Sequence, residues 1–244
     1  MSKIYALFAD GSCSEIVIGF LEPEESPLVL TPINLDLDVQ KAATNGFWAA
    51  FQVLRKSGFG LEKYSLSYQF KETGIPFTVM GGSAGLAFCL SFVQEIHQLL
   101  CGAPFPYSIA ATGVISDGTE KATVQSVTSI GTKLRGAVKA LAPWDKIFYP
   151  ACEQERIDPD FLEETATQGL EIIPVSTVQE AIGRLLERYV VQAYPLEIAG
   201  LKLVSEPGMY VYEARSWRQK VQIPIKLINR GGHPVQVEIQ KQEN

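Results

Sequence analysis

The sequence has little histidine, and this limits the catalytic and metal chemistry open to the chain. Two histidines, His97 and His233, occur among the 244 residues. The four cysteines include no Cys-x-x-Cys pair, so no zinc-ligand spacing exists and we expect neither a metal nor a cofactor. Cys101 follows His97 by four residues, but both lie in an apolar helical stretch, where core packing is favoured over a catalytic pair.

Three further absences narrow the range of partners. Lys and Arg form no strong cluster and the formal net charge is −6, so nucleic acid is not an expected partner. No stretch reaches the roughly 18 consecutive apolar residues of a membrane span, and Asp10 interrupts the apolar N-terminal run, which argues against a signal peptide. We therefore expect a cytoplasmic protein without membrane contact. No Gly-x-x-x-x-Gly-Lys-Ser/Thr string occurs, so we expect no ATPase activity in the chain itself.

What is present is an ordinary globular composition, 46% hydrophobic and 20% charged. Strand composition and alternating apolar residues predict strands at 5–7, 15–20, 64–70, 107–115, 146–149 and 171–175. Helical spacing predicts helices at 39–54, 83–101, 133–142, 161–168 and 177–190. Asp38 is the expected N-cap of the first of these helices, and Ser176 or Thr177 that of the last. The pattern predicts an α/β (α+β) domain, a mixed sheet with packed helices, over residues 1–193.

Residues 194–244 differ in composition. Alternating segments occur at 196–204, 209–214, 221–228 and 234–239, and Asn229-Arg230-Gly231-Gly232 is typical of a hairpin turn. We interpret this part as a small C-terminal all-β appendage, at about the minimum size for an independent unit.

Ser83 is the candidate nucleophile. The string Gly82-Ser83-Ala84-Gly85 places a hydroxyl among residues with almost no side chain, so a peptide carbonyl can approach it closely. If Ser83 opens the predicted helix, the free N–H groups of the first turn point at the same space, where they could stabilise an oxyanion. The same string is also typical of an ordinary helix start, in which Gly and Ser are turn and cap residues.

A serine nucleophile needs a general base, and Lys133 is the best candidate. His97 lies fourteen residues along the same predicted helix, which is about 20 Å from Ser83. A lysine acts as a base when burial lowers its pKa by several units from about 10.4. The small and apolar residues around Lys133 suit that requirement, and a helix start disfavours an ammonium. The ordinary interpretation of Lys133 is a solvated lysine on a helix turn.

Together these residues resemble the proteolytic domain of Lon proteases. Gly82-Ser83-Ala84-Gly85 is similar to the end of that family's Asp-Gly-Pro-Ser-Ala-Gly string, and Thr112-Gly113 resembles its Thr-Gly-Glu strand end. Lys133 falls on the family's catalytic lysine, and the distance from Lys133 to Pro150 reproduces the family's spacing. The similarity covers roughly residues 1–190. The chain departs from the family at Met80, Gly82 and Val114, where the family has Asp, Pro and Glu.

The resemblance implies a Lon-type fold and a Ser-Lys dyad, with Ser83 as nucleophile and Lys133 as base. It further implies that Thr112 hydrogen-bonds the lysine and that the amides of Gly82 and Ser83 form the oxyanion site. The expected activity is that of a stand-alone serine endopeptidase that cleaves unfolded or flexible polypeptides without ATP. A separate ATPase or adaptor is the expected candidate partner, and the family suggests a hexameric homo-oligomer.

Two other interpretations remain open. Gly81-Gly82-Ser83-Ala84-Gly85 also satisfies the Gly-x-Ser-x-Gly pattern of α/β-hydrolases, and Ser83, Asp145 and His233 follow that fold's chain order. However, no His-Gly-Gly-Gly string precedes Ser83.

The second interpretation is a non-catalytic protein-binding module on the same scaffold. The appendage contains Tyr210, Tyr212 and Trp217 near Arg215 and Arg218, a combination that is enriched in protein interfaces. Those aromatic residues also suit the small core of the appendage. A lowered pKa of Lys133 would favour catalysis, because a scaffold has no need of one.

Overall fold

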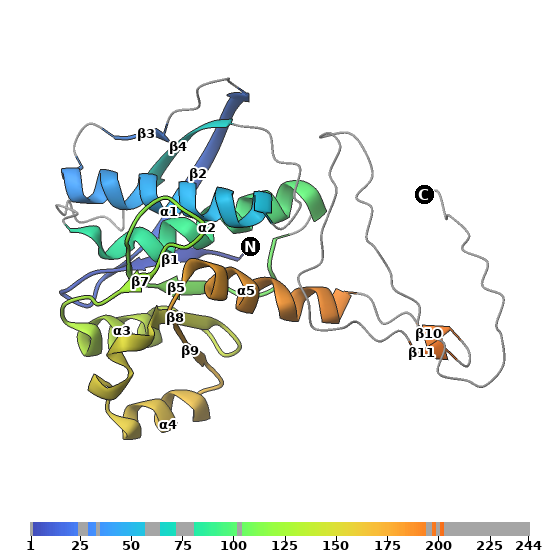
Figure 1. The fold of residues 1–244 in the computed structure, drawn as a ribbon. Coiled ribbons are helices and arrows are strands. Elements are labelled where there is room, and N and C mark those ends of the chain that lie inside the picture. The colour runs from blue at the N-terminus through green and yellow to red at the C-terminus, as the bar shows by residue number, and fades with distance from the viewer. Residues whose placement is uncertain are drawn as a thin grey trace.

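The computed structural model describes most of the first 193 residues and two short pieces beyond them (Figure 1). The described residues are 2–23, 29–32, 35–56, 64–71, 81–101, 104–193, 197–198 and 201–202. The α-helices are α1 (Leu37–Lys56), α2 (Gly85–Cys101), α3 (Ile130–Ala140), α4 (Pro159–Thr167) and α5 (Val178–Ala193), and the 3-10 helices are η1 (Gly82–Ala84) and η2 (Ala151–Arg156).

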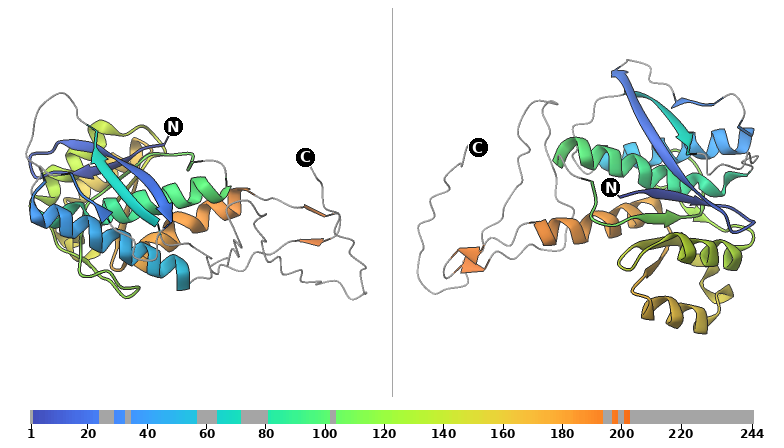
Figure 2. Two further views of the ribbon diagram at one scale, coloured as in Figure 1. Left: turned by 90° about the horizontal axis from the view of Figure 1, so that it is seen from above. Right: turned by 180° about the vertical axis from the view of Figure 1, so that it is seen from behind.

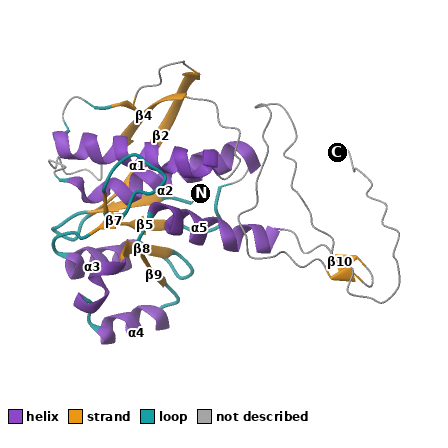
Figure 3. Cartoon of the chain, viewed as in Figure 1, coloured by secondary structure: helices purple, strands orange, loops and turns teal. Residues whose placement is uncertain are grey.

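The strands, coloured orange in Figure 3, form one large sheet and two small hairpins. They are β1 (Ile4–Leu7), β2 (Cys13–Pro23), β3 (Val29–Leu30), β4 (Tyr64–Phe70), β5 (Ile109–Ala111), β6 (Val114–Ile115), β7 (Val124–Gln125), β8 (Lys146–Pro150), β9 (Glu171–Val175), β10 (Glu197–Ile198) and β11 (Leu201–Lys202). The large sheet is mixed and has the order β3-β4-β2-β1-β5-β8-β9. Strands β1, β5, β8 and β9 run parallel to one another, whereas β2 is antiparallel to both of its neighbours.

The central strands are covered on both faces, because successive side chains of a strand point to opposite sides. Alternate residues join a core with α1, α2 and α5; from the strands these include Ile4, Ala6, Ile109, Ala111 and Phe148. The residues between them join a second core with α3, and these are Leu7, Ala110, Ile147 and Tyr149. Helices α1 and α2 lie side by side in all views, and α3 and α4 lie on the other side of β5 and β8 (Figures 1 and 2).

Helix α2 is the central helix of the domain. Its residues from Leu86 to Val93 are all buried, in agreement with a stretch that is apolar on every side. One face packs on α1, where the rings of Phe47 and Phe88 meet edge to face with centroids 5.6 Å apart. Because α2 is held between α1 and the sheet, the turn directly before α2, which contains η1, has a fixed position.

Most of the predicted elements are confirmed, with three corrections. The strand predicted at 107–115 is divided after Ala111, because Gly113 N–H donates to Ser83 O instead of continuing the sheet. The helix predicted at 133–142 begins at Ile130 rather than Lys133, since the Lys133 N–H already donates to Ser129 O. The carboxylate in the capping position before α1 is Asp36, whose Oδ1 accepts from Asp38 N–H at 3.2 Å; Asp38 itself is helical.

Other predictions lie partly or wholly outside the described residues. Of the appendage, the structure describes β10 and β11, which pair antiparallel. The strands predicted at 209–214, 221–228 and 234–239 lie outside the described residues. At the start of α5, Thr177 Oγ1 accepts from Glu180 N–H at 3.1 Å, which confirms Thr177 as a cap. None of the described helices combines the length and apolar character that crossing a membrane requires.

Candidate active site

The candidate site lies at the carboxyl end of β5, near the middle of the sheet. Helix α2 precedes β5 and packs in one core, whereas α3 follows it and packs in the other. The chain therefore changes faces around β5, and such a change is where open α/β sheets bind ligands. Thr112 directly follows the strand, and its N–H donates to Phe148 O of β8 at 3.1 Å. Residues from both helical layers meet at this point.

The turn before α2 presents Ser83. Gly81 has φ 83° and ψ 158°, a conformation that costs a residue with a side chain considerable strain. Its N–H donates to Asp36 Oδ2 at 3.4 Å, which ties the turn to the start of α1. Ser83 lies in the following 3-10 helix η1, and the residue is partly exposed.

Ser83, Thr112 and Lys133, the three predicted residues, are brought together. Lys133 Nζ lies 2.8 Å from Ser83 Oγ and 3.4 Å from Thr112 Oγ1. Thr112 Oγ1 also donates to Ser83 O at 3.3 Å. A threonine hydroxyl has one proton and two lone pairs, so Thr112 can accept from the lysine and donate to the serine carbonyl at once.

The lysine is almost completely buried, with 1% of its surface exposed, and Thr112 beside it is 0% exposed. Burial lowers the pKa of Lys133 from 10.5 to about 8, because a charged amine is poorly solvated there; the carboxylate of Glu153 acts in the opposite direction. A serine in a partly exposed position and a buried amine with a pKa of about 8 are the combination required of a nucleophile and its general base.

The main chain around Ser83 is fixed by two hydrogen bonds to its carbonyl oxygen. Gly113 N–H donates to Ser83 O at 2.8 Å, in addition to the bond from Thr112. Gly82 and Ser83, the predicted oxyanion donors, lie in the first turn of η1, where backbone N–H groups have no acceptor within the helix. Amides at a helix start are the kind of donor that an oxyanion site requires.

Two other predicted candidates, Asp145 and His97, do not join this group. Asp145 lies at the opposite end of β8, where its two carboxylate oxygens accept from the N–H groups of Ser108 at 2.7 Å and Ala142 at 2.9 Å. His97 is stacked on Phe105 with ring centroids 4.5 Å apart, in the core. The side chain of Cys101, like His233 and Met80, lies outside the described residues.

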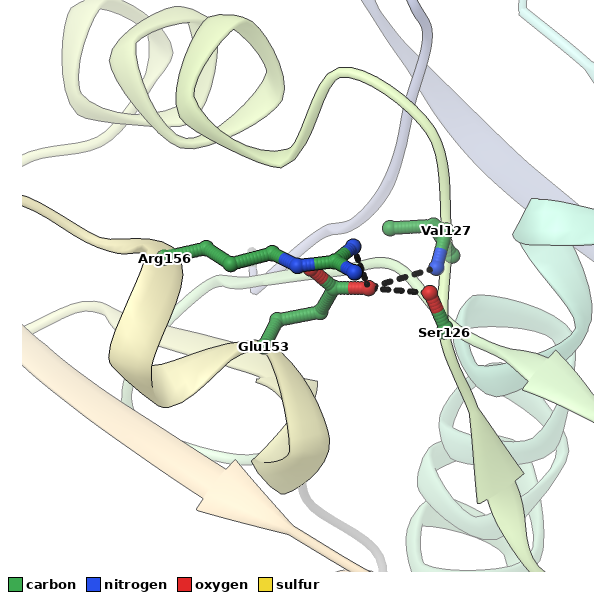
Figure 4. A network of polar contacts seen from close by, with 4 residues as sticks. All are labelled: Ser126, Val127, Glu153 and Arg156. Atoms are coloured by element: carbon green, nitrogen blue, oxygen red, sulfur yellow. Dashed lines mark hydrogen bonds and ion pairs between the residues drawn. The ribbon is translucent and has the colours of Figure 1, made fainter.

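Sequence reasoning did not identify Glu153, which lies in η2 after β8. Figure 4 shows its carboxylate between Arg156, Ser126 and the N–H of Val127. Burial alone would raise the pKa of Glu153, but the bonds from Ser126 and Val127 and the nearby Arg156 hold it below its ordinary value. Nothing in the sequence distinguishes Glu153 from the exposed Glu155, because its burial depends on the packing of η2 against α3.

Comparisons with known proteins add no relative. No protein-family model matches the chain, and no curated protein matches it. The functional conclusion therefore depends on the geometry of the site.

Proposed function

We propose that this chain is a serine endopeptidase that uses a Ser-Lys dyad, in a domain of the Lon type. The single observation that carries the proposal is the distance of 2.8 Å between Lys133 Nζ and Ser83 Oγ, at a lysine with 1% exposure. Burial of a lysine amine costs stability, and a scaffold gains nothing from that cost. The lowered pKa of Lys133 thus favours an enzyme over a non-catalytic scaffold on the same fold.

The reaction proceeds by acyl transfer to the serine. The neutral amine of Lys133 accepts the Ser83 hydroxyl proton while Oγ attacks the scissile carbonyl carbon. The resulting oxyanion is stabilised by the amides of η1, and the tetrahedral intermediate then releases the amine product, which takes the proton from the Lys133 ammonium. Water attacks the acyl ester with Lys133 as base again, which frees the acid product and restores Ser83.

Thr112 supports this reaction without entering it. Its hydroxyl accepts from Lys133 Nζ and donates to Ser83 O, so it fixes the lysine relative to the nucleophile. This orientation matters for the rate, because a displacement of a catalytic group by about 1 Å can lower the rate about 100-fold.

The substrate we propose is an unfolded or flexible polypeptide, cleaved without ATP, with delivery by a separate ATPase or adaptor for folded substrates. Both statements rest on the Lon resemblance of Ser83, Thr112 and Lys133 and on the absence of a phosphate-binding loop in this sequence. Hexameric assembly is part of the same proposal.

The test is degradation of casein, an unfolded protein, in the absence of ATP. We expect wild type to cleave it, and both Ser83→Ala and Lys133→Met to lose activity by at least about 1,000-fold. Cleavage by wild type should rise between about pH 6 and about pH 10 with an apparent pKa near 8, as Lys133 becomes neutral.

The matched controls are Ser91→Ala and Lys139→Met. Ser91 is buried in α2, where its hydroxyl donates to Ala87 O at 2.8 Å, and Lys139 is exposed on α3. Both variants should keep most of the activity. Full activity of Lys133→Met would contradict the dyad, as would a rate that rises only above about pH 10.

A further inference from the structure

Glu153 has no part in the proposed reaction, although it is 0% exposed and lies within electrostatic range of the proposed base. A carboxylate is seldom fully buried unless its environment compensates the loss of water. The carboxylate of Glu153 accepts hydrogen bonds from Ser126 and Val127, which lie at the entrance to α3 (residues 126–129), and from Arg156 in η2, as Figure 4 shows. These bonds replace the lost water.

The entrance to α3 needs such support. Residues 126–129 connect β7 to α3, and Ser129 has φ 56° and ψ 38°, a left-handed conformation that is unfavourable for serine. The side chain of Ser129, at the N-cap position, makes no capping hydrogen bond. A backbone in this conformation persists when its surroundings hold it. Glu153 Oε1 accepts from Ser126 Oγ and from Val127 N–H at 3.2 Å, and so holds the first half of the connection.

Lys133 lies one turn inside the helix that this connection begins. Its N–H donates to Ser129 O at 3.1 Å, so a displacement of the entrance moves the lysine as well. We infer that Glu153 is a positioning residue, whose buried carboxylate holds the entrance of α3 and thereby keeps Lys133 Nζ at Ser83 Oγ. The catalytic consequence of this inference rests on the proposed function.

The charged neighbours of Glu153 are few. Arg156 Nη1 lies 3.2 Å from Oε2, and the arginine side chain is 69% exposed, so water screens much of its charge. Other charged residues on the packed elements are engaged elsewhere or exposed: Arg135 lies over the Phe161 ring, Lys146 pairs with Glu171, and Lys139 is exposed. The charge of Glu153 therefore acts on two cations, the exposed Arg156 and the buried Lys133, whose pKa it raises.

The experiment uses the full chain and compares Glu153→Gln and Glu153→Ala with Glu155→Gln, an exposed glutamate two residues along η2. The first readout is the titration of the Lys133 side chain, followed by NMR on protein labelled with ¹³C at the lysine ε-carbons and assigned with Lys133→Met. Loss of the carboxylate should lower the Lys133 midpoint below its wild-type value in Glu153→Gln, because Glu153 raises the pKa of Lys133. Glu155→Gln should titrate as wild type.

The second readout is casein cleavage at saturating substrate. Glu153→Gln retains an oxygen acceptor for Val127 N–H and should lose about tenfold in kcat or less, with its pH profile moved to lower pH. Glu153→Ala leaves the buried N–H without its acceptor and should lose about 100-fold. KM should change little in either variant, because Glu153 does not contact substrate.

An unchanged Lys133 midpoint in Glu153→Gln would overturn the inference, as would wild-type kcat in a folded Glu153→Ala. If Glu153→Ala does not fold, the Lys133 midpoint of Glu153→Gln alone tests the role of Glu153. Absence of cleavage by wild type would overturn the proposed function instead, while the titration, which needs no substrate, still judges the role of Glu153.

Discussion

At the scale of single residues, Lys133 is a site where catalysis and stability oppose each other. Its pKa is about 8 in the folded chain against 10.5 when solvated. Below pH 8 the lysine is charged in both states, so folding bears the full cost of desolvating the ammonium. Between these two values the folded chain releases the proton and the unfolded chain keeps it, so stability rises with pH; above 10.5 the cost is gone.

Lys133→Met should therefore stabilise the protein. We expect the free energy of unfolding at pH 7 to rise by about 1 to 3 kcal/mol, an upper limit of about 3 following from the shift in the pKa of Lys133. The gain should shrink as the pH rises from 8 and vanish near 10.5, as measured by urea denaturation across this range. Lys139→Met, on the exposed side of the same helix, should differ from wild type by the same amount at every pH. A Lys133→Met protein less stable than wild type at pH 7 would contradict burial of the charge.

At the scale of elements, the position of α3 depends on a close approach to the turn between β1 and β2. A Cβ atom added to Gly136 would lie 2.1 Å from Gly11 O, well inside the contact distance. The contact joins the backbone of the β1–β2 turn to the backbone of α3, and Gly136 lies three residues beyond Lys133. A side chain at position 136 would therefore require a shift of α3 or of the turn.

Gly136→Ala should therefore displace α3. We expect a loss of about 1 to 3 kcal/mol in the free energy of unfolding and at least about a tenfold loss of casein cleavage, because Lys133 moves with the helix. Gly131→Ala is the control on the same helix, since a Cβ atom there meets nothing within 4 Å. It should leave cleavage unchanged and raise stability by up to about 1 kcal/mol. Equal effects of the two substitutions would show that the approach to Gly11 does not place α3.

At the scale of the whole molecule, the two cores that the described residues form and the candidate site lie within the first 193 residues. The two clusters of buried side chains extend from Ile4 to Leu185, and Ser83, Thr112 and Lys133 lie between those ends. Deletion of residues 194–244 should leave the unfolding midpoint and the rate of casein cleavage near their wild-type values. The deletion also removes His233, so loss of cleavage in a folded, truncated protein would favour a triad that uses His233 over the dyad.

The sequence by itself determined the elements and the candidate nucleophile and base. Periodicity predicted strands and helices such as β9 and α2 because their apolar spacing reflects which face is buried. Because histidine is scarce, lysine is the expected base, and the small and apolar neighbours of Ser83 and Lys133 predict their roles. The predicted strand at 107–115 was too long, because its break after Ala111 depends on the hydrogen bond from Gly113 N–H to Ser83 O in another element. The cap was placed two residues too late, at Asp38 instead of Asp36.

The tertiary structure decided how these residues meet. Fifty residues separate Ser83 from Lys133, and their approach to 2.8 Å requires α2 and α3 to pack on opposite faces of the sheet beside β5. The same packing buried Glu153 and left Glu155 exposed. A local pattern cannot specify such contacts, because burial and the pKa shifts that follow from it are properties of the packed elements and of no single segment.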